Sequence, residues 1–110
     1  MEAQSEPIIV FMTAANSEEA SRIAELLVSR KLAACVQILP EMKSIYVWKG
    51  EVQREREVLL LAKTTRANFE RLEHEVRTIH SYETPEIIAV PIEAGSEAYL
   101  KWLISSCEGS

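Results

Sequence analysis

The sequence lacks a surplus of positive charge. Its 110 residues include 12 lysines and arginines against 17 acidic residues, which gives a formal net charge of −5. Proteins that bind nucleic acids need excess lysine and arginine to displace counterions from the phosphate backbone. The balance therefore argues against a nucleic-acid partner and favours small metabolites, cations or other proteins.

The chain also lacks long hydrophobic runs and a cysteine framework. No stretch approaches the roughly 20 apolar residues of a membrane span, and the acidic start does not suit a signal peptide. The two cysteines, Cys35 and Cys107, form no CxxC motif and no disulfide framework. We therefore expect a cytoplasmic protein with reduced thiols that does not associate with membranes.

What is present is an alternation of short apolar runs and amphipathic segments. After a polar tail at 1–6, strands are expected at 8–14, 33–48, 51–63 and 86–92. Helices are expected after a cap at Asn16 or Ser17, after a cap at Thr65, and after Gly95-Ser96. The order β-α-β-β-α-β plus a C-terminal helix predicts one α+β domain over 1–110. Its fold would be a ferredoxin-like split βαβ sandwich, with helices on one face of a four-stranded antiparallel sheet.

The two middle strands predict an unusually long hairpin. Lys49-Gly50 fits a tight turn that sets Trp48 opposite Glu51, and Pro40 predicts a bulge because proline cannot donate to the ladder. Sixteen extended residues span roughly 53 Å, whereas a domain of this size is roughly 34 Å across. The hairpin must therefore bend or protrude. Its outer half is apolar, so a partner subunit is expected to cover it.

Charges alternate along the second half of this hairpin. Gln53, Glu55 and Glu57 share one face of the expected strand, and Arg54 and Arg56 share the other. Opposite faces of neighbouring subunits would pair around a three-fold axis. A solvated strand of mixed charge fits the same pattern.

Five strings carry a family resemblance: KLAACVQILP, SIYVWKGEV, LLLAKTT, HSYETPEI and YLKWL. Their order and spacing resemble those of the CutA family of divalent-cation tolerance proteins, from about residue 8 to 104. The resemblance implies a homotrimer joined through the long hairpin, with a three-fold architecture like that of the PII signalling proteins. It further implies binding of copper or another divalent metal, no organic cofactor and no established enzymatic reaction. The family's cleft motif falls on Cys35, Tyr46, Trp48, Lys63, His80, Tyr82, Glu83 and Pro85.

The candidate metal ligands are His80, Cys35 and Met12. Copper favours imidazole and sulfur ligands, and the resemblance implies a site between a sulfur residue of the first strand and a histidine after the second helix. Here the strand position holds Met12, a thioether. Each candidate also has a structural interpretation, as a buried residue for Cys35 and Met12 and as a helix cap for His80.

A second function class uses the remaining cleft residues. Tyr46, Trp48, Lys63, Tyr82 and Glu83 suit an apolar-walled cleft with polar anchors, so a trimeric small-molecule or anion sensor with intersubunit clefts is the alternative. The aromatic residues equally fit the role of interface anchors.

Catalysis is the least favoured interpretation. The sequence has no glycine-rich phosphate loop, no GxSxG and no HExxH motif. Glu83, Lys63 and Tyr82 form an acid–base set only if the fold brings them together, and a Glu83–Lys63 pair would also serve structure. We therefore predict a protein that is not an enzyme.

Overall fold

Four strands and three α-helices make up the part of the chain described by the computed structural model, residues 5–109. In chain order the elements are β1 (Pro7–Ala14), α1 (Ser17–Ser29), β2 (Cys35–Trp48), β3 (Glu51–Thr65), the 3-10 turn η2 (Arg66–Asn68), α2 (Phe69–Ile79), β4 (Ile87–Pro91) and α3 (Glu97–Ser106). The expected order of strands and helices is confirmed. Residues 1–4 of the expected polar tail lie outside the described residues.

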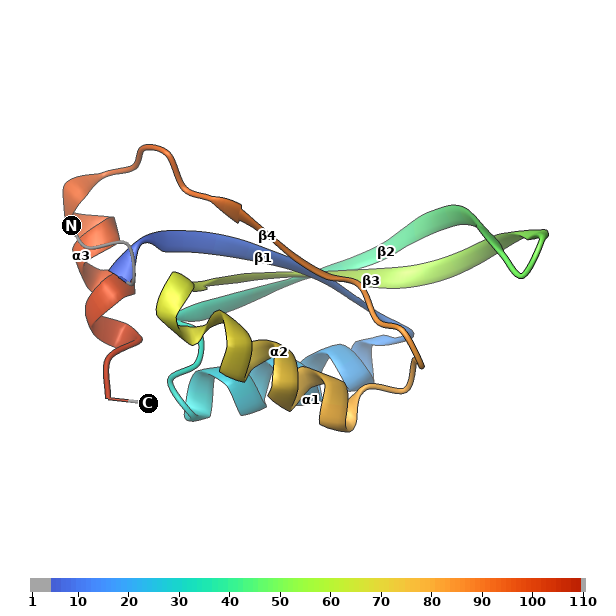
Figure 1. Ribbon diagram of the computed structural model, residues 1–110, viewed down its shortest axis with the longest axis horizontal. Coiled ribbons are helices and arrows are strands. Elements are labelled where there is room, and N and C mark those ends of the chain that lie inside the picture. The colour runs from blue at the N-terminus through green and yellow to red at the C-terminus, as the bar shows by residue number, and fades with distance from the viewer. Residues whose placement is uncertain (1–4, 110) are drawn as a thin grey trace.

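The strands form one antiparallel sheet in the order β2-β3-β1-β4. Helices α1 and α2 lie against one face of it, and α3 lies at the end of the sheet where β1 begins (Figure 1). Met12 stands opposite Leu60 on one side and Ile87 on the other. Directly opposed residues share a face, and Met12 and Leu60 are fully buried beneath the helices. The core therefore lies between this face and the two long helices.

The other face of the sheet, here called the open face, carries Ile9, Phe11, Leu59, Leu61, Leu39, Ile88 and Val90, by the alternation of side chains along each strand. Leu39, Ile88 and Val90 are 44%, 56% and 42% exposed. The face is thus apolar but largely uncovered in a single protomer.

Beyond the end of β1, the hairpin of β2 and β3 continues as a free arm, residues 42–57 (Figure 1). The molecule measures 45 × 25 × 22 Å, so the expected protrusion is confirmed. At the tip, Lys49 and Gly50 have φ angles of 51° and 82°, the pair of positive values that a type I′ turn requires. Trp48 pairs with Glu51 as expected, and a register shift between Leu39 and Met42 marks the bulge expected at Pro40.

Thr65 stands at the N-cap position of η2, but the capping hydrogen bond expected of its side chain is absent. Thr65 still pairs with Pro7 as the last residue of β3. The chain turns instead through η2, and α2 begins only at Phe69. At α1 the expectation holds, because the Asn16 side chain accepts a hydrogen bond from the Glu19 N–H at 2.9 Å.

Within residues 5–109 no helix has the length and apolarity needed to cross a membrane.

Candidate functional site

Segment 80–86, which leads from α2 to β4, is fixed to the end of β1 by the His80 ring. The ring Nε2 lies 2.7 Å from the Thr13 carbonyl oxygen, and Nδ1 lies 3.0 Å from the Tyr82 backbone N–H. A carbonyl only accepts, so Nε2 carries the proton and Nδ1 accepts. The side chain is fully buried. Both ring nitrogens are therefore occupied by hydrogen bonds to the backbone.

A buried carboxylate, that of Glu19, makes the second attachment of this segment. Its Oε1 accepts from the Ala15 N–H at 3.0 Å and its Oε2 from the Ser81 N–H at 2.7 Å. Burial acts to raise the pKa of Glu19, but the hydrogen bonds from Ala15 and Ser81 outweigh it, and the pKa is lowered. Glu19 thus stays ionised and joins the start of α1 to segment 80–86. The pattern Asn16-x-x-Glu19, typical of a capping box, is the sequence signal that points to it.

Tyr82 connects this segment to the arm. Its hydroxyl donates to Glu57 Oε2 at 2.8 Å, and Glu57 is only 7% exposed. The pKa of the Tyr82 phenol is strongly raised, mainly by burial and further by the contact with the Glu57 carboxylate. The phenol therefore stays protonated and acts as a hydrogen-bond donor.

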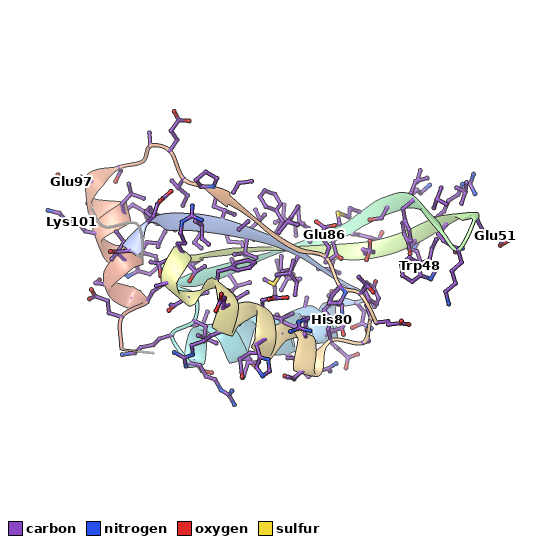
Figure 2. All side chains as sticks on the ribbon, in the orientation of Figure 1. Trp48, Glu51, His80, Glu86, Glu97 and Lys101 are labelled. Atoms are coloured by element: carbon purple, nitrogen blue, oxygen red, sulfur yellow. The ribbon has the colours of Figure 1, made fainter. Side chains whose placement is uncertain are left out.

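Between the arm and segment 80–86 lies a groove of about 760 Å³, here called the acidic groove. It is lined by Thr13, Ser44, Ile45, Tyr46, Trp48, Gln53, Glu55, Glu57, Tyr82, Glu83, Thr84 and Glu86. Four of these residues are glutamates, and none is a lysine, arginine or histidine. Figure 2 shows Trp48 out on the arm, Glu86 near the start of β4 and His80 between the sheet and α2. The groove combines aromatic side chains with concentrated negative charge.

Four of the five expected cleft residues meet in this groove: Tyr46, Trp48, Tyr82 and Glu83. The fifth, Lys63, lies at the other end of β3, with its Nζ 5.5 Å from the centre of the Tyr99 ring. Within one protomer, Lys63 therefore contributes no charge to the groove.

The candidate metal ligands are distributed over both faces of the sheet. Met12 is fully buried on the helix side of the sheet. The His80 Nε2 donates to the carbonyl oxygen of Thr13, the residue that follows Met12 in β1. Cys35 pairs with Lys63 and lies, half-buried, on the open face. Among residues 5–109 no group of three or more histidine, cysteine or acidic side chains is placed to hold a metal ion.

Some groove residues were not expected from the sequence. Glu57 and Glu55 could have been found, because the alternation along 53–57 already puts both on one face, with Tyr46 paired to Gln53 on the same side. Glu86 and Thr13 carry no such signal. They reach the groove only because segment 80–86 folds over the end of β1.

Comparisons with known proteins identify the family and support the overall fold. A family model described as CutA1 divalent ion tolerance protein matches residues 8–106. The chain is similar to the divalent-cation tolerance protein CutA of Thermus thermophilus, at 47% identity over 86% of this chain and 92% of that protein. To the chloroplastic protein CutA of Arabidopsis thaliana it is 44% identical over 90% of this chain, and it spans only 54% of that relative's length. The crystal structure of CutA1 from Oryza sativa aligns with a TM-score of 0.93 at 40% identity, covering 99% of this chain and 100% of that one.

Proposed function

The chain belongs to the CutA1 divalent ion tolerance family, and we propose that it is a non-enzymatic homotrimer that binds a divalent cation such as copper. The protomer would be one ferredoxin-like domain, and the trimer would have a three-fold, PII-like arrangement. The observation that carries the cation-binding proposal is the acidic groove, where four glutamates face a shared space without a lysine or arginine in its lining. Such a groove attracts cations through its summed field.

The arm supports the homotrimer. Its apolar side chains Ile45, Val47 and Val52 are 63%, 66% and 52% exposed in one protomer. Exposed apolar area costs about 25 cal/mol per Å², and an uncovered strand edge invites pairing. The open face adds more apolar surface, so other copies of the chain are the natural cover.

Light scattering tests the assembly. We expect a mass three times the 12.4 kDa of one chain. A monomer at micromolar concentration would contradict the assembly proposal.

Cys35, His80 and Met12 remain the proposed ligands of a copper ion. None of the three lines the acidic groove, so the groove would attract cations to the protein and the copper itself would be bound elsewhere. Cys35 is the most accessible, because it is half-buried on the open face, where a neighbouring subunit can approach. His80 could bind a metal through Nδ1 only if the Tyr82 N–H released it. A copper site on these residues therefore depends on contacts between subunits or on movement of segment 80–86.

Calorimetric titration with copper tests this site. We expect saturable binding that Cys35→Ser weakens and that Cys107→Ser, at the other cysteine, leaves unchanged. Density in a copper-soaked crystal would locate the ion at Cys35 or at His80. If no saturable heat is measured, the metal-binding half of the proposal fails.

The second candidate function is a small-molecule sensor, and its support is the aromatic lining of the acidic groove. Trp48, Tyr46 and Tyr82 provide flat apolar walls beside polar anchors. The glutamates make an anion the less suitable ligand. A cytoplasmic location is part of the proposal. Within residues 5–109 neither Cys35 nor Cys107 forms a disulfide, which supports a reducing compartment.

A further inference from the structure

We infer that the acidic groove is a binding site for a linear aliphatic polyamine. The inference rests on the second candidate function and names its class of ligand. It does not depend on the copper site at Cys35, His80 and Met12.

The carboxylates of the groove are spread along it. Glu55 and Glu57 stand two residues apart on one side of β3, which separates their Cα atoms by about 7 Å. Glu83 and Glu86 belong to segment 80–86, on the opposite wall. A compact ion can reach only part of this set. A chain of ammonium groups joined by short methylene runs can reach carboxylates on both walls.

Glu57 is the most buried carboxylate of the groove. It is 93% buried as a residue (7% exposed), and Tyr82 occupies only its Oε2. Within residues 5–109 its Oε1 makes no hydrogen bond, and the residue belongs to the groove lining. A largely desolvated carboxylate with a free oxygen is costly unless a positive group meets it.

The aromatic walls suit the methylene segments and the charges of such a ligand. Trp48 and Tyr46 project from the same side of the arm as Glu55, and Tyr82 faces them across the groove. Ammonium groups are attracted to aromatic faces, and methylenes pack on them. Partial burial and then the nearby Glu55 carboxylate raise the pKa of Tyr46. The phenol therefore does not compete as an added negative charge.

Among residues 5–109, no lysine, arginine or histidine belongs to the groove lining. Arg54 and Arg56 alternate with the groove-facing residues and project from the other side of β3. Arg56 lies 4.0 Å from the exposed Glu41. The two arginines of the arm are thus directed away from the groove.

Titration calorimetry of the full chain with spermidine at low ionic strength tests the inference. We expect saturable binding that added salt weakens. Glu55→Gln should reduce the affinity roughly threefold to tenfold, as expected for one partly exposed charge pair. Trp48→Leu should reduce it by about tenfold through the lost cation–π contact. The matched control is Glu93→Gln, which removes the same charge from an exposed residue after β4 and should leave the affinity unchanged.

The inference is overturned if no saturable heat appears, or if Glu55→Gln and Glu93→Gln bind spermidine equally. Displacement of spermidine by magnesium at the same concentration would also overturn it, because the groove would then sense charge alone. Light scattering and the copper titration are run on the same samples. A trimer that binds copper but not spermidine removes this inference and leaves the main proposal intact. A trimer that binds spermidine but not copper supports this inference and removes the copper-binding part of the main proposal.

Discussion

The same two strands build both the body of the protein and its arm, yet the two regions differ in what covers them. In the body, Leu60 of β3 is fully buried between the sheet and the helices. In the arm, Val47 of β2 and Val52 of β3 face each other, 66% and 52% exposed. Hydrogen bonding between the strands is continuous through both regions except at the bulge. The comparison shows that the hydrogen bonds between β2 and β3 and the turn at Lys49-Gly50 suffice to shape the arm. Its apolar side chains, by contrast, stabilise the protein only when a partner covers them.

The largest expected effect on the free energy of unfolding comes from truncating one apolar side chain in the body, compared with one in the arm. Leu72→Ala, at a fully buried position of α2, should lower the free energy of unfolding by about 3 kcal/mol through the cavity it leaves. Val47→Ala, at an exposed position, should change a lone protomer by less than about 0.5 kcal/mol. Denaturant unfolding at several protein concentrations measures both.

If a partner covers the arm, the Val47→Ala effect is largest at concentrations where the chain is assembled and falls to the small value of a lone protomer as dilution dissociates the assembly, since unfolding is then linked to dissociation. An effect equal to that of Leu72→Ala at every concentration would contradict the distinction between body and arm.

The second effect concerns segment 80–86, which Glu19 holds to the start of α1 and which contacts the arm through Tyr82. Glu19→Gln should lower the free energy of unfolding by about 2 kcal/mol at neutral pH, because it weakens charged hydrogen bonds to Ala15 and Ser81. The folded pKa of Glu19 is below its ordinary value. Its contribution is therefore fully present above the unfolded pKa and is lost as the pH falls through the folded pKa.

Urea unfolding at neutral and at acidic pH measures this contribution. The wild type should lose part of its stability on acidification, and Glu19→Gln should lose less. Glu25→Gln, on the exposed side of α1, is the control and should follow the wild type. An unchanged pH dependence in Glu19→Gln would show that this carboxylate is not stabilised in the fold.

The third effect tests the contact between segment 80–86 and the arm. Tyr82→Phe removes the hydroxyl that donates to Glu57, and we expect a loss of about 1 kcal/mol in thermal or urea unfolding. Tyr99→Phe, at a residue that is 40% exposed, should change stability by a few tenths of a kcal/mol at most. Equal effects of the two variants would argue against the Tyr82–Glu57 contact.

The smallest effect lies at the tip of the arm. Lys49 occupies a left-handed conformation with φ 51°, which asparagine tolerates better than lysine. Lys49→Asn should therefore raise the free energy of unfolding by about 0.5 kcal/mol. Lys49→Ala removes the same charge without that backbone preference and should give no gain. A loss of stability in Lys49→Asn would show that the turn is not of type I′.

The hairpin could be predicted to the residue because its determinants are local. Lys49-Gly50 fixes the turn, and the turn fixes the pairing of Trp48 with Glu51. One wall of the acidic groove could also be read from the sequence, through the alternation that puts Glu55 and Glu57 on one face.

The other wall could not be predicted from any local pattern, because contacts between distant residues place it. Tyr82 and Glu83 were expected in a cleft only through the family resemblance. His80 bonds to Thr13, 67 residues away, and Ser81 bonds to Glu19, 62 residues away. No local sequence pattern predicts contacts between residues so far apart in the chain. For the same reason the sequence grouped Lys63 with the groove residues, although the length of β3 separates them within one protomer.

The bulge in β2 has a consequence for how this strand can vary. In the body, Gln37 and Leu39 face the same side as Leu61 and Leu59. In the arm, even-numbered residues face that side instead, with Tyr46 beside Gln53. The extra residue between Leu39 and Met42 reverses which side chains of β2 face which side of the sheet. Packing in the core sets the alternation before it, and the turn sets the alternation after it. Without the extra residue, an unbroken alternation would direct Val47 toward the glutamates and turn Tyr46 and Trp48 away. The arm is thereby a separate module, free to acquire new groove chemistry while the pattern that builds the core stays as it is.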